Sequence, residues 1–317
     1  MQPAFSVIAF TVCSGAGFGL YMLLAMAHVL GFLPILSRGE ILFGIVLAMV
    51  LVIVGLLSST LHLANPKNAW RAFFRFRTSW LSREGVFAVL FFPFAGLYLL
   101  GVYFADMKTG DIGFFSKLMG LFGVMLAFAT LFSQGMIYGC LKTIKQWNTP
   151  LTPTNYILLA FMTGALLLNV VLAFSGQAVG VMGGITVGLI VTAGISKAIY
   201  YYWIRTPSGS SINTATGFLR GNVRLLDVGH TAATFLTDEF GYKTAKGQLN
   251  LFKAVVFVCG FFIPFLLTAF SVIGASAAVF SALLAFVIAM VGITAERWLF
   301  FAEANHVVNL YHGAQRT

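Results

Sequence analysis

The sequence predicts an all-α, polytopic membrane protein built as a bundle of eight transmembrane helices. Of its 317 residues, 59% are hydrophobic and only 9% are charged, against roughly 25% charged residues in an ordinary soluble domain. The apolar stretches are continuous and do not alternate with polar residues, as the strands of a membrane β-barrel would. This composition excludes a soluble globular protein, a disordered chain and a disulfide-stabilised scaffold.

Each predicted span is an apolar stretch of about 20 residues without Asp, Glu, Lys or Arg. Four such spans lie near residues 5–30, 41–61, 85–105 and 118–141. The longer uncharged stretches 146–196 and 254–295 each have room for two spans, with turns at 175–177 and 271–274. The total is eight helices.

Prolines and glycines predict local features inside these spans. Pro93 and Pro264 lie within the third and seventh spans and are expected to kink them. Two groups of glycines have the small-xxx-small spacing that permits close helix contact, Gly15 with Gly19 and the run Gly180, Gly184 and Gly188.

The distribution of charge predicts the orientation in the membrane. Eight spans place both termini on one side, and this side carries every Lys and Arg except Arg38, Lys108 and Lys117. By the positive-inside rule it is the cytoplasmic side, and it holds the net charge of +10. All 5 Trp lie there too, which indicates either a docking or ligand-binding face or a one-sided lipid belt.

We therefore expect residues 1–317 to form a single integral membrane domain, with 205–247 as a cytoplasmic loop within it. This loop is too short for a separate domain with its own core. It is long enough to form a docking surface for another protein.

The segment 62–84 holds the residues best suited to chemistry. His62 closes the second span and Glu84 opens the third, so we expect both at the cytoplasmic edge and near each other. A neutral His and a carboxylate beside a small cavity can bind a quinone head group, hydrogen-bond its oxygens and exchange protons with it. Trp70 or Trp80 could stack on the ring.

Interfacial anchoring is the alternative for the same residues. In that interpretation His62 bonds to the backbone, and Glu84 pairs with Arg83 or Arg77 at a helix N-terminus, where an acid is favoured.

The end of the last span carries three more candidates. Glu296, Glu303 and His306 have a spacing that places them on one helix face, where they line a polar path or form a solvated helix end that contacts a partner. Within the membrane we expect little polarity beyond Gln134 and Asn169, which argues against an ion-coupled transporter but not against passage of a neutral solute.

The histidines bear on haem binding. His28 lies on the far side, whereas the others, His62, His230, His306 and His312, lie on or near the cytoplasmic face. A bis-histidine haem across the bilayer is therefore not expected, and a single haem between His62 and His306 remains an alternative.

Three runs resemble a known family: His62-Leu63-Ala64-Asn65-Pro66, Ala69-Trp70-Arg71-Ala72-Phe73 and Ser79-Trp80-Leu81-Ser82-Arg83-Glu84. They are similar to the membrane-anchor subunits of dimethyl sulfoxide reductase. The segments 223–227 and 240–242 and the ending 295–303 look more like the branch that anchors quinone-linked sulfite dehydrogenases. The resemblance covers nearly the whole chain.

The resemblance implies a three-subunit complex in the bacterial cytoplasmic (inner) membrane. It would contain a molybdopterin catalytic subunit and an iron–sulfur subunit, and this multi-pass chain would exchange electrons with ubiquinone or menaquinone. The positive charge of the cytoplasmic face and the 205–247 segment there, not the resemblance, lead us to expect both subunits to dock on that face. Glu84 would exchange protons, His62 would hydrogen-bond the quinone, and Arg77 and Trp80 would be neighbours. Haem and metal ligation by this chain and nucleic-acid binding are not expected, whereas membrane lipids are.

The direction of electron flow divides the functional alternatives. Sulfite oxidation to sulfate would deliver electrons to the quinone, whereas a dimethyl sulfoxide reductase-type complex would oxidise quinol. A haem-bearing anchor and a stand-alone transporter are the remaining classes.

Overall fold

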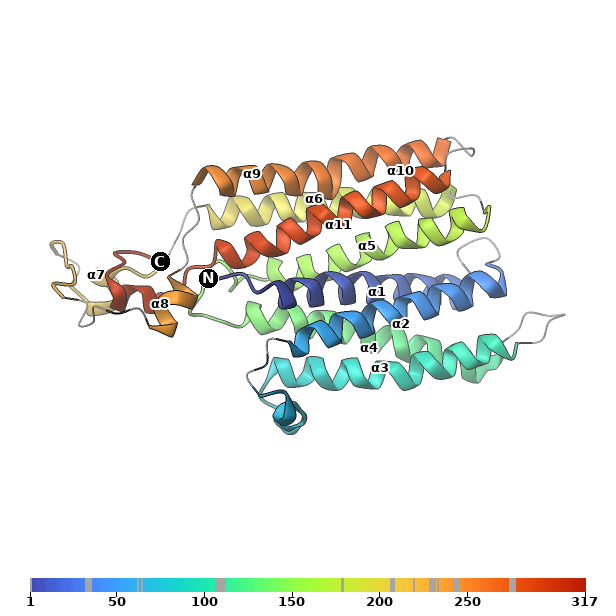
Figure 1. Cartoon of the computed structure of the whole chain (residues 1–317), viewed down its shortest axis with the longest axis horizontal. Coiled ribbons are helices and arrows are strands. Elements are labelled where there is room, and N and C mark those ends of the chain that lie inside the picture. Colours follow the sequence, from blue (N-terminus) through green and yellow to red (C-terminus); the bar gives the residue numbers. More distant parts are fainter. Residues whose placement is uncertain are drawn as a thin grey trace.

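The computed structural model describes residues 2–31, 36–61, 63, 65–105, 112–177, 180–205, 209–218, 220–227, 232, 234–241, 246–273 and 278–317. Within these ranges, eight helical segments are long and apolar enough to cross a membrane. They run side by side along the long axis of the molecule (Figure 1). The predicted all-α, polytopic membrane fold is confirmed.

Six of the spans are single helices in chain order: α1 (Phe5–Leu30), α2 (Arg38–Thr60), α3 (Trp80–Tyr103), α4 (Gly113–Gly139), α5 (Leu151–Phe174) and α6 (Gly180–Ile204). The seventh is composite, with α9 (Lys246–Phe257), a π-helix η2 (Val258–Phe262) and α10 (Ile263–Ile273). The eighth is α11 (Ala278–Ala302). The turn predicted at 175–177 follows α5 directly, and Gly176 has the positive φ of 70° that glycine accepts without steric cost.

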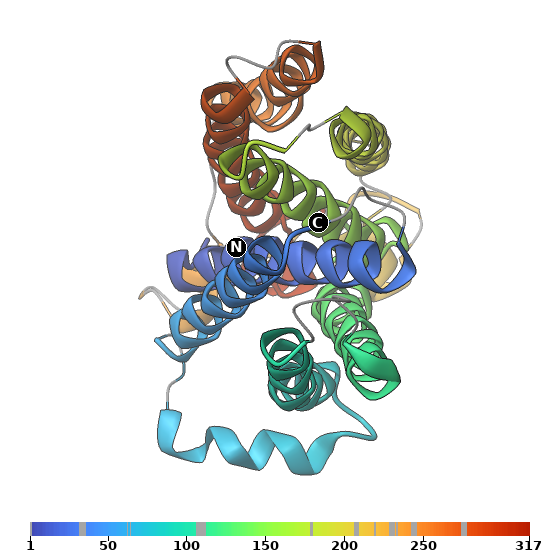
Figure 2. The same cartoon turned by 90° about the vertical axis from the view of Figure 1, so that its right-hand side faces the viewer.

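Helices α1 and α5 form the centre of the bundle. In their most apolar stretches 83% and 78% of the residues are buried, against 33% for α2 and 28% for α3. Figure 2 shows these two helices between α3 and α4 on one side and α9–α11 on the other. The outer helices therefore expose their apolar side chains to lipid.

The central pair crosses with its backbones in contact at Gly19 and Gly164. A Cβ atom added to Gly19 would lie 1.9 Å from the carbonyl oxygen of Ala160, and one added to Gly164 would lie 2.2 Å from the carbonyl carbon of Gly19. The small-residue spacing at Gly19 thus serves a close helix contact. At Gly184 an added Cβ would meet nothing within 4 Å, as at Gly180 and Gly188, so this second group makes no such contact.

The π-helix η2 has a local cause in Pro264. Proline lacks the backbone N–H, and its ring clashes with the carbonyl four residues earlier, here Gly260. The wider π turn relieves this conflict. It also lies where α11 comes closest, since a Cβ on Gly292 would lie 2.1 Å from the backbone nitrogen of Gly260. Pro93, by contrast, lies inside the continuous helix α3.

Both termini lie at the same end of the bundle, together with the described parts of the 205–247 segment (Figure 1). This segment contains the short helices α7 (Ile212–Thr216) and α8 (Phe235–Phe240). The C-terminal 3-10 helix η4 (Val307–His312) packs on α8, where Asn309 Nδ2 donates to the carbonyl of Phe240 at 3.0 Å. We call this end the terminal end.

A further 3-10 helix, η1 (Pro66–Arg75), connects α2 and α3 at the terminal end. It runs across the bundle and has no buried residue (Figure 2).

We expect Gly19→Ala to reduce folded protein strongly, because its methyl group would overlap the backbone of α5. Gly184→Ala is the matched control, since its methyl enters open space and alanine favours a helix by about 0.5–1 kcal/mol over glycine. The measurement is the monodisperse fraction and thermal stability in detergent. Equal stability of the two variants would contradict the close crossing.

Candidate functional site

Glu84 lies near the start of α3, which begins after an N-cap at Ser79 whose hydroxyl accepts from the backbone N–H of Ser82 at 3.3 Å. The side chain turns into the bundle and is only 4% exposed. Its Oε1 atom has no hydrogen-bond partner among the described residues. Because burial of a carboxyl oxygen without a partner is costly, this position indicates a functional role.

The polar neighbours of Glu84 come from three other helices. Gln134 of α4 lies within hydrogen-bonding reach of the carboxyl group. The amide Nε2 of Gln134 also donates to the hydroxyl of Ser14 in α1 at 3.3 Å. Tyr138 of α4 and Tyr156 of α5 are close enough to act on Glu84 electrostatically. Glu84 thus faces the polar centre of the terminal end.

An open groove of about 660 Å³ lies between α3 and α4 beside this carboxyl group. Its lining residues are mainly aromatic: Phe76, Arg77, Trp80, Arg83, Phe87, Phe128, Ala129, Phe132 and Ser133. Glu84 does not itself line the groove. Trp80 and Phe87, which line it, lie four residues before and three residues after Glu84 on α3, so Glu84 is on the side of α3 next to the groove.

Arg83 shapes this groove. Its guanidinium lies 4.2 Å from the centre of the Trp80 ring. It also donates to the carbonyls of Phe76 and Arg77, at 3.0 and 2.8 Å. Trp80 in turn packs edge-on against Phe132 of α4, with ring centres 5.7 Å apart. The aromatic wall is therefore held in place before any ligand arrives.

These contacts argue against the anchoring interpretation of Glu84. Arg83 is directed to backbone carbonyls and to Trp80. Among the ion pairs that the structure describes, those of residues 197, 253, 296, 297 and 303, none involves Glu84.

The other predicted site residues divide into three groups. Trp80 and Arg77, which we expected to lie near a bound quinone, both line the groove. Trp70 lies on η1 and is 55% exposed. His62 lies outside the described residues, as does His230.

The protein-family comparison matches residues 1–302 to the family described as "DMSO reductase anchor subunit (DmsC)". The chain belongs to this family. It is similar to the C subunit of the sulfite dehydrogenase of Allochromatium vinosum, at 31% identity over 98% of this chain and 99% of the relative. It is also similar to the C component of the anaerobic dimethyl sulfoxide reductase of Escherichia coli, at 24% identity over 60% of this chain and 66% of the relative.

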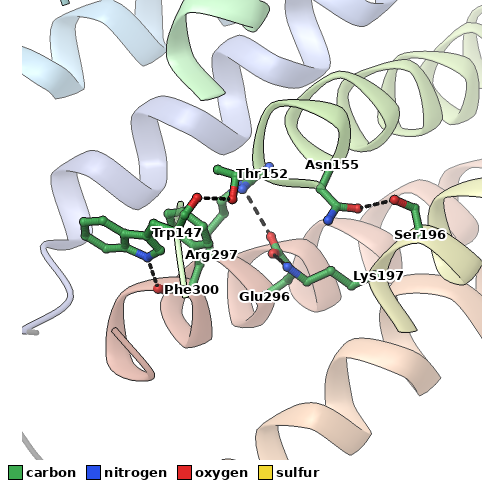
Figure 3. Close-up of polar contacts among 8 residues, drawn as sticks. All are labelled: Trp147, Thr152, Asn155, Ser196, Lys197, Glu296, Arg297 and Phe300. Atoms are coloured by element: carbon green, nitrogen blue, oxygen red, sulfur yellow. Dashed lines mark hydrogen bonds and ion pairs between the residues drawn. The ribbon is translucent and has the colours of Figure 1, made fainter. Parts of the chain in front are cut away.

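This anchor-family protein also contains a buried ionic cluster, which we define as Lys197, Glu296 and Arg297. Lys197 of α6 forms an ion pair with Glu296 of α11 (Figure 3). The second carboxylate oxygen of Glu296 lies 3.4 Å from Nε of Arg297. All three side chains are buried, with Glu296 at 0% exposure. The cluster has two cations for one anion.

The sequence interpretation missed this cluster because it ended each span at the first charged residue. It assigned Lys197 to the cytoplasmic segment, whereas α6 continues to Ile204 through the apolar and aromatic run after the lysine. Likewise α11 continues past Glu296 and Arg297 to Ala302. The expectation of little polarity in the spans beyond Gln134 and Asn169 is therefore wrong. The aromatic residues that follow Lys197 are the feature of the sequence that indicates a longer helix.

A small cavity lies between Arg297 of the cluster and Gln134, the polar neighbour of Glu84. Its walls include Gln134, Tyr156 and Arg297, and its volume of about 10 Å³ is about the space one water molecule needs. The guanidinium carbon of Arg297 lies 3.7 Å from the centre of the Tyr156 ring. Oε1 of Gln134 and the hydroxyl of Tyr156 have no hydrogen-bond partner among the described residues.

The other polar residues of the last helix lie further out. Glu303 forms an ion pair with Lys253 of α9 at 2.5 Å. His306 lies beyond the end of α11 and therefore does not share a helix face with Glu296. Its Nδ1 accepts from the backbone N–H of Val308 at 3.0 Å, and burial lowers its pKa. His306 therefore has a capping role in η4.

Trp147, predicted among the interfacial tryptophans, is instead 1% exposed. Its indole Nε1 donates to the carbonyl of Phe300 at 2.8 Å, which holds the α4–α5 connection to the end of α11 (Figure 3). The carbonyl of Trp147 accepts from the hydroxyl of Thr152 at 2.7 Å. Together the two hydrogen bonds hold the start of α5 against the end of α11.

We expect Glu296→Gln to lower the free energy of unfolding by about 3–5 kcal/mol, because it leaves two buried cations without their anion. Lys197→Met should cost less, since Glu296 keeps Arg297 as a partner. Denaturant titration of both variants in the same detergent measures which one loses more free energy of unfolding. A larger loss in Lys197→Met would show that Arg297 does not share the carboxylate.

Proposed function

We propose that this protein is the quinone-reactive membrane anchor of a three-subunit molybdenum and iron–sulfur oxidoreductase. In this proposal it passes electrons between an iron–sulfur partner subunit and the quinone pool of the bacterial inner membrane. The observation that carries the proposal is the buried Glu84 carboxyl, with an unpartnered oxygen, on the helix whose residues Trp80 and Phe87 line an aromatic groove at the terminal end. Membership of the anchor family supports it independently.

The residues of the groove are suited to a quinone. Its flat ring favours aromatic surfaces such as Trp80 and Phe132, which line the groove. A quinone, when bound, carries two electrons together with two protons. Glu84 is the group able to hold and release a proton there, and Arg77 supplies a fixed positive charge at the groove edge. His62 is proposed as a hydrogen-bond partner from its place in the sequence at the end of the second span and from the resemblance.

We propose sulfite oxidation to sulfate as the reaction of the whole complex. The support is the similarity along nearly the full length to a protein named as part of a sulfite dehydrogenase. The similarity to the dimethyl sulfoxide reductase component is lower and covers less of this chain, which makes a quinol-oxidising reductase the second candidate. The substrate chemistry belongs to a molybdopterin partner subunit in either case.

We further propose that the terminal end faces the cytoplasm and carries the iron–sulfur and catalytic subunits. This end combines the groove, both termini and the 205–247 segment. Electrons reach a quinone only if the iron–sulfur subunit lies close to it. Proton exchange on the same side means that turnover need not move charge across the membrane.

We expect Glu84→Gln to assemble normally but to lower quinone-linked turnover about 100-fold or more, the usual contribution of a general acid or base. The assay uses the purified complex with sulfite and a soluble ubiquinone analogue. Glu40→Gln is the matched control, because Glu40 is a buried carboxyl that caps α2 at the opposite end. Full activity of Glu84→Gln would refute the assigned role. Partners that co-purify while sulfite is inert would favour the sulfoxide reductase branch.

Orientation is tested by proteolysis in sealed vesicles of known sidedness. We expect the 205–247 segment to be cut only when the cytoplasmic side is accessible, because the positive charge of the terminal end is retained there. A tag on the 106–111 connection should show the opposite pattern. Cleavage of 205–247 from the outer side alone would overturn the proposed docking face.

A further inference from the structure

The buried ionic cluster does not line the groove proposed to hold a quinone, and it lies between α6 and α11, near the same end of the bundle as Glu84. Ionisable groups inside a membrane are costly and are retained mainly where they serve a path for ions or protons. A buried ion pair is a weak stabiliser, because apolar groups of similar volume often replace it without loss. The cluster therefore calls for a functional explanation.

Charged groups and a tyrosine ring lie between the surface and the cluster. Glu303 and Lys253 pair at 2.5 Å and are partly exposed, at 14% and 31%. Nζ of Lys253 lies 5.2 Å from the ring centre of Tyr201, and Nζ of Lys197 lies 4.9 Å from the same ring. Glu303 is also close enough to act on Lys197 electrostatically. Glu303 is thus a partly exposed carboxylate on the surface side of Lys197, from which a proton would reach Lys197 through water.

The series continues from the cluster to Glu84. Lys197 contacts Glu296, which lies beside Arg297. Arg297 shares the small cavity with Tyr156 and Gln134, and this cavity has room for about one water molecule. Gln134 lies within hydrogen-bonding reach of Glu84. The two unpartnered polar atoms, Gln134 Oε1 and the Tyr156 hydroxyl, are the groups that such a water would join.

We propose that Lys197 and Glu296 relay protons between Glu84 and the aqueous phase at the terminal end. When a quinone is reduced, Glu84 gives up its proton to it. The ammonium group of Lys197 protonates the Glu296 carboxylate, and this proton passes on to Glu84 through water in the cavity beside Arg297. Water at Glu303 then returns a proton to Lys197. Quinol oxidation reverses each transfer. Only O–H and N–H bonds form and break, while Arg297 stays protonated throughout.

Arg297 has a positioning role in this relay. Its positive charge lies between Glu296 and Tyr156. It therefore stabilises the ionised form of Glu296, which Lys197 protonates in each cycle. Lys197 differs from it chemically, because an ammonium group can lose a proton in a buried site and a guanidinium cannot. This difference separates a relay from a structural ion pair.

The relay rests on the proposed quinone function, and its test uses proton uptake as a separate measurement. The purified complex is first reduced with reduced methyl viologen, a one-electron donor whose oxidation releases no proton, because sulfite oxidation would release the protons that quinone reduction consumes. Quinone analogue is then added, and proton uptake is followed with a pH indicator over a single turnover. Lys197→Arg keeps the cation and its pair with Glu296 but removes the exchangeable proton. Lys197→Met removes both. Lys145→Met, an exposed lysine on the α4–α5 connection, is the matched control.

We expect proton uptake to slow at least tenfold in both Lys197 variants, with added methylammonium restoring part of the rate in Lys197→Met. Quinone-analogue affinity, followed through tryptophan fluorescence, should be unchanged. A structural ion pair predicts instead that Lys197→Arg behaves as wild type, and this result would overturn the relay. Unchanged proton uptake in both variants would also overturn the relay.

Two results separate failure of the relay from failure of the proposed function. If the wild-type complex neither binds nor reduces the quinone analogue, the proposed function is wrong and the relay fails with it. If Glu84→Gln abolishes quinone turnover while the Lys197 variants take up protons normally, the quinone site stands and only the relay is overturned.

Discussion

The backbone contact between α1 and α5 is the constraint on which the arrangement of the bundle depends. Gly19 and Gly164 allow the two helices to touch where any side chain would separate them. In a bilayer, apolar side chains gain little by leaving lipid, so such close van der Waals packing is a main source of helix association. The remaining spans are then placed on either side of this central pair.

The same contact brings distant polar residues together. Ser14 of α1 accepts from Gln134 of α4, and Tyr156 of α5 reaches toward both Glu84 and Arg297. The residues meet only because α1 and α5 share the centre of the bundle. Lys197 and Glu296 then approach from the α6 and α11 side. The buried chemistry of the terminal end is thus a product of packing between six spans rather than of one motif.

Much of the fold was predictable because lipid imposes a simple rule on composition. Continuous apolar runs located all eight spans, and residues 5–30 match the limits of α1. The same rule failed at Lys197 and Glu296, where helices continue past charges that pair with each other. The ion pair is a tertiary contact between α6 and α11, so neither charged residue predicts it from the sequence alone. The groove beside Trp80 likewise depends on Phe132 from another helix.

The π turn at Val258–Phe262 has a consequence for the phase of the seventh span. A π turn acts as one residue added to an α-helix, and each residue of an α-helix rotates its side chain by about 100°. Lys253, on the near side of this turn, faces Glu303, while Phe261 within it packs beneath Gly194 of α6. If one residue were removed from the π turn, the helix could keep the contact of Lys253 with Glu303 or that of Phe261 with Gly194, but not both. The seventh span therefore serves two neighbours whose angular positions no single regular helix would match.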